Sequence, residues 1–159
     1  MLNLKGLVHF TIPVSNAKQS AEFYTKVLGM KEIMHVIPVG MVFMRCGKDY
    51  LILTETKEPL CVAKGDDNAL HHAFAVEADE FDKSIEFLTS KGVRVIHRDE
   101  RHEGVFVGRS AYFHDPDRNV LEIIDLKAPT FRPLAAFPPS VLASLMSGQA
   151  KASGQPHKV

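Results

Sequence analysis

The sequence predicts an α+β fold with mixed sheets, built from two copies of a βαβββ module. An internal repeat supports this prediction, because "LVHFTIPVSNAKQSAEFYTKVLGMK" and "ALHHAFAVEADEFDKSIEFLTSKGVR" run in parallel along the chain. Both copies carry a Ser-x-Glu-Phe-x-Thr segment, at residues 20–25 and 84–89. Apolar, β-rich runs follow each copy, and such runs favour strands that succeed one another directly.

Each repeat opens with a short apolar strand that carries a histidine. His9 stands three residues before Ile12, and His71 stands three residues before Phe74. The β-rich runs that complete the modules cover residues 31–37, 40–46 and 50–55 in the first half, and 93–97, 110–115 and 120–125 in the second.

An amphipathic helix follows the first strand of each repeat. Ser15 or Asn16 can cap the first helix, and Asp79 can cap the second, because short polar side chains accept hydrogen bonds from the free N–H groups there. Gly29 and Gly92 are the expected stops, since glycine readily adopts the left-handed conformation that ends many helices.

The modules predict the domain organisation. We expect one domain over residues 1–127, with module one at about 5–56, a polar linker at 57–68 and module two at 69–127. The extension at 128–159 is proline-rich and has room for one short helix at about 140–147. Its last part, from Gln149, has the small-residue polar composition of a disordered tail.

Composition narrows the class of protein. The chain has 159 residues, and Lys plus Arg balance Asp plus Glu at 19 each, so neither nucleic acid nor an anionic membrane is an expected partner. No apolar run approaches the roughly 20 residues of a membrane span, and the N-terminus lacks a signal-peptide pattern. Cys46 and Cys61 are too few for a disulfide or zinc framework, and we expect reduced thiols in a cytoplasmic protein.

Glu122 interrupts the apolar run "NVLEII". A carboxylate in such a strand must face solvent at an edge, meet a cation or bind a metal. Superposing the repeats aligns His9 with His71, and these two histidines with Glu122 would form a two-histidine, one-carboxylate triad that leaves metal positions open. His72 competes with His71, but adjacent strand residues point to opposite faces, and the frame of the repeat selects His71.

The motifs "HHAFAV" and "YFHDPDRNVLEI" resemble those of the vicinal oxygen chelate superfamily, which includes glyoxalases, bleomycin-resistance proteins and extradiol dioxygenases. The resemblance implies that each module curls into a half-barrel and that paired half-barrels enclose a divalent first-row metal. It assigns His9, His71 and Glu122 as ligands, with Fe(II) or Mn(II) favoured over Ni(II) or Zn(II). Arg118 replaces the family's turn glycine, and we expect Asn119 to adopt the left-handed conformation there.

The same resemblance implies a small-molecule substrate that chelates the metal through two neighbouring oxygens. It also implies a homodimer, because several relatives with one module pair share the metal site between subunits. Ile52 or Leu53 stands where glyoxalase I enzymes generally have a fourth ligand, which disfavours lactoylglutathione lyase activity.

Extradiol dioxygenase chemistry is narrowly the first expectation. Tyr112 stands ten residues before Glu122, where such dioxygenases have a tyrosine that positions the catecholate and moves its protons, and His102 is close to their upstream histidine. Ala111 and Arg118 depart from that signature.

Two alternatives remain open. Fosfomycin-resistance enzymes, which add a thiol or water to an epoxide, are of this size; the resemblance places Thr11 near the epoxide and Tyr112 at the phosphonate. Arg98, Arg101 and Arg109 are the available cations, without the Lys-Ser spacing of that family. The other alternative is a metal-free drug-binding protein, which would not need three ligands in register.

Overall fold

The computed structural model describes residues 7–57, 68–102 and 106–127, and within them the predicted βαβββ module occurs twice. Most of the predicted linker and the whole 128–159 extension, with its expected helix and tail, lie outside the described residues. The elements of module one are β1 (His9–Val14), α1 (Ala17–Lys26), β2 (Lys31–Val36), a 3₁₀ turn (Ile37–Val39), β3 (Met41–Cys46) and β4 (Asp49–Glu55). Those of module two are β5 (His72–Ala75), α2 (Phe81–Ser90), β6 (Val95–Arg101), β7 (Gly108–His114) and β8 (Val120–Ile124).

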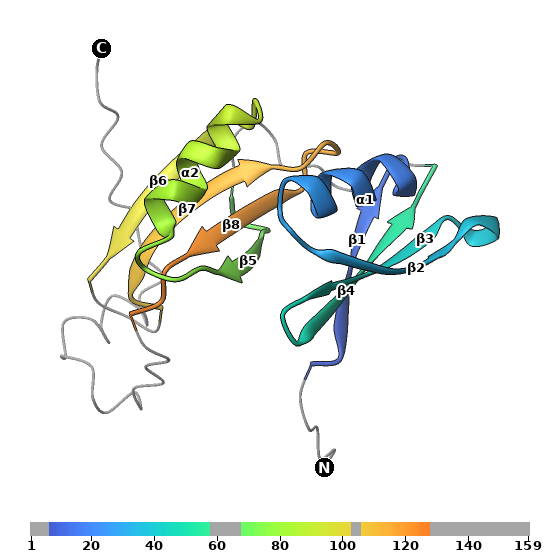
Figure 1. Cartoon of the computed structure of the whole chain (residues 1–159), viewed down its shortest axis with the longest axis horizontal. Helices are drawn as coiled ribbons and strands as arrows, with labels where there is room; N and C mark the ends of the chain where they lie inside the picture. The colour runs from blue at the N-terminus through green and yellow to red at the C-terminus, as the bar shows by residue number, and fades with distance from the viewer. Residues whose placement is uncertain (1–6, 58–67, 103–105, 128–159) are drawn as a thin grey trace.

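Each module forms its own four-stranded mixed sheet, in the order β1-β4-β3-β2 or β5-β8-β7-β6. The first strand pairs in parallel with the last, while the other pairs are antiparallel. The two sheets lie side by side, with β1 near β5 (Figure 1). The predicted α+β class, with two mixed-sheet modules, is therefore confirmed.

The structure confirms the predicted residues at three of the four helix ends. Asn16 caps α1 by accepting a hydrogen bond from the N–H of Gln19, and Gly29 and Gly92 have the expected positive φ of 67° and 77°. The prediction that Asp79 caps α2 is wrong. The cap residue is Glu80, whose backbone is already helical and whose side chain makes no capping bond, because a turn closed onto Glu77 leads directly into the helix.

A single hydrophobic core connects both modules on the helix side of the sheets. Alternate strand residues point toward the helices, as strand geometry requires. The core members include Ile12, Val42, Leu53, Phe81, Phe113 and Ile123. We call the opposite side of each sheet its open face.

The turn between β7 and β8 joins module two to α1 of module one. The buried Tyr24 hydroxyl donates a hydrogen bond of 3.0 Å to the Asp115 carboxylate, and the Ser20 hydroxyl donates one of 2.9 Å to Asp117. Burial raises the pKa of Asp115, although hydrogen bonds from Asn119, among others, act against this. We call residues 115–119 the inter-module turn.

The left-handed position of this turn differs from the prediction. Arg118 itself has a positive φ of 66°, rather than Asn119. Asn119 instead uses its side-chain amide to donate to Asp115 at 2.8 Å and to the carbonyl of Pro13 in β1 at 3.0 Å. Asn119 thus adds a further link between the modules.

We expect Asp115→Ala to lower the free energy of unfolding by about 2 kcal/mol, because several buried or half-buried donors lose their acceptor. Urea denaturation followed by circular dichroism measures this. Glu22→Ala is the matched control, since Glu22 contacts Lys26 on the exposed side of α1, and its midpoint should stay close to that of the wild type. Equal midpoints for the two variants would contradict an inter-module role for Asp115.

Candidate active site

Glu122 lies in the middle of β8, on the open face of module two, and only 2% of its surface is exposed. Its register partners are Tyr112 in β7 and Ala73 in β5. A buried carboxylate needs compensating partners, and a histidine and an arginine lie against the two oxygens of Glu122. His71 Nε2 lies 2.9 Å from one carboxylate oxygen, and Arg101 Nη2 lies 2.8 Å from the other.

His71 precedes β5, and a backbone carbonyl holds its ring through the nitrogen that does not face Glu122. Its Nδ1 lies 2.7 Å from the carbonyl oxygen of Asn68. Because a carbonyl only accepts, Nδ1 carries a proton, and Nε2 is the nitrogen directed at Glu122. An unprotonated Nε2 and a carboxylate oxygen repel each other at 2.9 Å unless a proton or a metal cation lies between them. The pair therefore has the donor chemistry of two converging metal ligands.

His72 points the other way. Its ring stacks on Phe10 of β1 with centroids 5.0 Å apart, and burial lowers its pKa. The two adjacent histidines thus have different surroundings, one beside Glu122 and one between the modules.

Of the three arginines that the sequence offers, one reaches Glu122. Arg101 also donates a 2.6 Å hydrogen bond to the buried Ser110 hydroxyl. Arg109 is bound by Asp125 and Asp82 at the edge of α2, and Arg98 is exposed on the opposite face of β6.

Tyr112 lies beside Glu122 and is 4% exposed. Its ring meets the ring of His71 edge-on, with centroids 5.3 Å apart. Burial, followed by the negative charge of Glu122, raises the pKa of Tyr112, while Arg101 acts in the opposite direction. A hydrogen bond with Glu122 adds to the rise, and the phenol is therefore protonated at neutral pH.

His97 belongs to the same surface but was not among the predicted site residues. It is half-buried in β6, paired in register with Tyr112, and the two rings are 5.7 Å apart. Alternation places residues 97, 99 and 101 on one face of β6, but a bulge between Val95 and His97 interrupts the pattern. The sequence pattern was therefore only a weak indication that His97 belongs to the site.

The other predicted site residues lie elsewhere. His9 and Thr11 are exposed in β1, paired in register with Tyr50 and Ile52. His102 follows β6 with 72% of its side chain exposed, and its nearest charged partner is Glu100. Among the described residues, no three or more His, Cys, Asp or Glu side chains are grouped to hold a metal. A single chain thus brings together His71, Glu122 and Tyr112, without His9.

The register also identifies the counterpart of Glu122 in module one. Thr11 pairs with Ile52 as Ala73 pairs with Glu122, so Ile52, rather than Leu53, occupies the equivalent position. Glu55 lies at the end of β4 and accepts a 3.1 Å hydrogen bond from the backbone N–H of Ala17. Module one therefore places no carboxylate at the position of Glu122.

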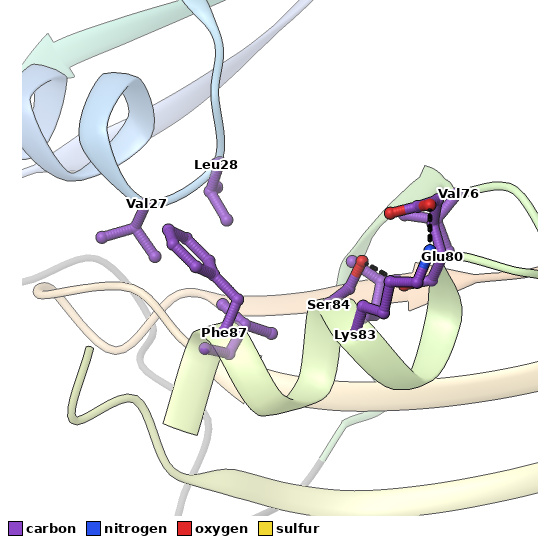
Figure 2. Close-up of a pocket in the computed structure, with 9 residues that line it drawn as sticks. Val27, Leu28, Val76, Glu80, Lys83, Ser84 and Phe87 are labelled. Atoms are coloured by element: carbon purple, nitrogen blue, oxygen red, sulfur yellow. Dashed lines mark hydrogen bonds and ion pairs between the residues drawn. The ribbon is translucent and has the colours of Figure 1, made fainter. Parts of the chain in front are cut away.

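A cleft of about 430 Å³ lies on the helix side of the molecule, between the end of α1 and α2. Phe87 faces Val27 and Leu28 across it (Figure 2). Ile123 also lines this cleft, and because it adjoins Glu122 in β8, the two side chains point to opposite faces. The cleft is therefore separate from the Glu122 site. Within the described part of the chain, no helix is long and apolar enough to cross a membrane.

We expect the free energy of unfolding to fall as the pH rises above about 10, the ordinary tyrosine pKa, because Tyr112 then ionises in the unfolded chain before it ionises in the folded one. Tyr112→Phe should lack this part of the fall, as measured by urea denaturation at a series of pH values. The difference in tyrosinate absorbance between wild type and Tyr112→Phe measures the ionisation of Tyr112. When Arg101→Gln is introduced into both proteins, this ionisation should shift to still higher pH, because the cation that favours the tyrosinate is gone. An unchanged titration would refute the charge contact between Arg101 and Tyr112.

Comparisons with known proteins agree with this architecture. The glutathione transferase FosA of Serratia marcescens is 28% identical over 120 residues, covering 76% of this chain and 80% of the relative. The fosfomycin resistance protein FosX of Listeria monocytogenes is 27% identical over 124 residues, covering 76% and 89%. A variant of that FosX, solved with Mn(II) and 1S,2S-dihydroxypropylphosphonic acid, superposes with a TM-score of 0.64 at 23% identity, covering 77% of this chain and 91% of the other.

The family assignment rests on a match along most of the described chain. Residues 6–123 match the family model of the Glyoxalase/Bleomycin resistance protein/Dioxygenase superfamily. The match includes both modules, from β1 to most of β8. The chain therefore belongs to this superfamily, as its repeated modules and terminal motif predict.

Proposed function

We propose that the chain is a divalent-metal-dependent enzyme of the fosfomycin-resistance type, which opens an epoxide by adding a thiol or water. The observation that carries this proposal is the convergence of His71 and Glu122 beside Arg101 and Tyr112. The names of the relatives support this chemistry over the dioxygenase chemistry that the tyrosine spacing favours. The dioxygenase function remains a prediction that oxygen uptake would test.

The proposed ligands are His71 and Glu122 of one chain and His9 of a second copy. Two imidazole nitrogens and a carboxylate oxygen suit Mn(II), Fe(II), Ni(II) or Zn(II) and leave positions for a substrate. When bound, such a metal supplies Lewis-acid stabilisation of the oxygen that gains negative charge. The Asn68 carbonyl keeps the His71 ring in the tautomer that directs Nε2 to this position.

The neighbouring side chains determine which substrate fits. Fosfomycin carries an anionic phosphonate beside its epoxide, and the Arg101 guanidinium and the Tyr112 hydroxyl are charged and neutral donors for such an oxyanion. The raised pKa of Tyr112 keeps its donor proton in place at neutral pH. Thr11 of the second copy, two residues beyond His9, would face the epoxide.

The placement of the open faces supports the involvement of a second copy. Within one chain the two sheets lie side by side, so their open faces do not enclose each other (Figure 1). Module one also exposes apolar side chains, with Met34 at 53% and Tyr50 at 46%. A homodimer that places the open face of module one over that of module two would cover this surface and bring His9 to Glu122.

We expect purified chain loaded with Mn(II) to consume a thiol or water with fosfomycin, measured by phosphorus NMR of the product. Glu122→Gln should reduce kcat/KM by about 100-fold or more, because it removes a ligand charge. Glu100→Gln, in the exposed face of β6, is the matched control and should keep activity. Oxygen uptake with catechols would favour the dioxygenase instead, and the absence of stoichiometric metal would favour a metal-free binding protein.

We expect the inactive variants His9→Gln and Glu122→Gln to regain activity when they are mixed by co-refolding. A heterodimer with shared sites has one site in which all three ligands are native. Random pairing should restore about a quarter of the wild-type activity. Each variant refolded alone is the control. A mixture that stays inactive, although native mass spectrometry detects the heterodimer, would rule out sites shared between two chains.

A further inference from the structure

We infer that Arg101 is an internal counter-cation, which occupies Glu122 in the metal-free chain, is displaced when a divalent metal binds, and thereby sets the metal affinity. This inference rests on the proposed metal site and adds a residue outside its ligand set. The Arg101–Glu122 ion pair is then one of two exchangeable states of the site, rather than a fixed structural contact.

The first state is the one that the structure describes. Arg101 Nη2 lies 2.8 Å from the Glu122 carboxylate and 2.6 Å from Ser110 Oγ, while the Glu122 side chain is 3% exposed. Removing a carboxylate from water is costly unless a cation compensates it. Arg101 supplies that charge on one carboxylate oxygen, and His71 contacts the other.

The arginine is the more movable partner of the pair. Glu122 lies within β8, with paired strands on both sides, whereas Arg101 is the last residue of β6, a strand at the edge of its sheet. The Arg101 side chain is 34% exposed and extends from outside the site on a flexible stem. Its departure requires no change in strand register.

A second carboxylate lies within reach of the displaced arginine. Asp99 stands two residues earlier on the same strand, and its carboxylate is 3.8 Å from Arg101 Nε, too far for a hydrogen bond. That Nε has no hydrogen-bond partner among the described residues although it is buried. A small rotation toward Asp99 would satisfy this nitrogen and release the Glu122 oxygen.

Electrostatics favours one state over the other once a metal binds. A divalent cation and a guanidinium that contact the same carboxylate repel each other, and a metal that takes both Glu122 oxygens needs the one that Arg101 now contacts, so metal binding would release Arg101 from Glu122. Breaking charge-assisted hydrogen bonds weakens the apparent metal affinity by about tenfold. The arginine would also keep the carboxylate oriented while no metal is bound.

Calorimetric titration of the full chain with Mn(II) tests this inference. Arg101→Gln should bind Mn(II) about tenfold more tightly than the wild type, because the competing cation is gone. Arg101→Lys should lie between them, since it keeps the charge and loses the fork geometry. Arg98→Gln, which removes the same charge from the opposite face of β6, should match the wild type. Unchanged or weaker affinity in Arg101→Gln would overturn the inference.

Thermal unfolding separates competition from a merely structural role. Without metal, Arg101→Gln should melt below the wild type, because Glu122 loses a partner; with saturating Mn(II), the difference should shrink or reverse. An equal loss of Tm in both conditions would reject displacement.

The proposed function can fail separately from this inference. If wild type binds Mn(II) and Glu122→Gln does not, the metal site stands and the Arg101 variants test the arginine alone. If neither wild type nor Arg101→Gln binds Mn(II), the metal site itself is refuted.

Discussion

The modules of this chain are joined by a polar turn at their boundary, with no strand pairing between their two sheets among the described residues. Asp115 is the centre of this contact, because it organises its own turn and accepts the Tyr24 hydroxyl of the other module. This contact and the shared hydrophobic core hold β1 next to β5, with both helices on one side of the molecule (Figure 1). The open faces therefore lie beside each other, and the proposed site, which needs both, would be completed by a second copy of the chain.

The two modules share a backbone fold but differ in the side chains on their open faces. In module one, the row that pairs Thr11 with Ile52 continues to Phe43, so this row has no charged side chain. In module two, the corresponding row runs from Ala73 through Glu122 and Tyr112 to His97. The same backbone thus carries an uncharged row in one copy and a row with hydrogen-bonding and ion-pairing side chains in the other.

Patterns that repeat along the chain predicted most of the fold. The repeat identified both modules and the two glycine stops, and it narrowed the cap of α1 to Ser15 or Asn16, because each depends on local sequence. The alternation rule separated His71 from His72 and left Glu122 in need of a partner. It did not identify Arg101, because that contact depends on the register of β6 beyond a bulge and on a long side chain that reaches back across the sheet.

The reaction class was harder to predict for a different reason. The resemblance gives Tyr112 a role in dioxygenases and in fosfomycin-resistance enzymes, so the presence of this residue does not by itself distinguish the two reactions.

The Asp79 prediction failed because a turn closed by backbone atoms, from Glu80 to Glu77, leads into the helix without a side-chain cap. Side-chain patterns carry little information about such turns.

The stack of His72 on Phe10 has a consequence for folding accuracy. β5 has only four residues, and a short strand has few ladder bonds to define its alignment on β8. A slip by one residue would exchange the faces of His71 and His72, and two adjacent histidines would make the error chemically inconspicuous. The aromatic contact with Phe10 opposes the slip that would put Ala73 in the place of His72, because alanine has no ring to stack on Phe10. Phe10 thus favours the alignment in which His71, rather than His72, lies beside Glu122.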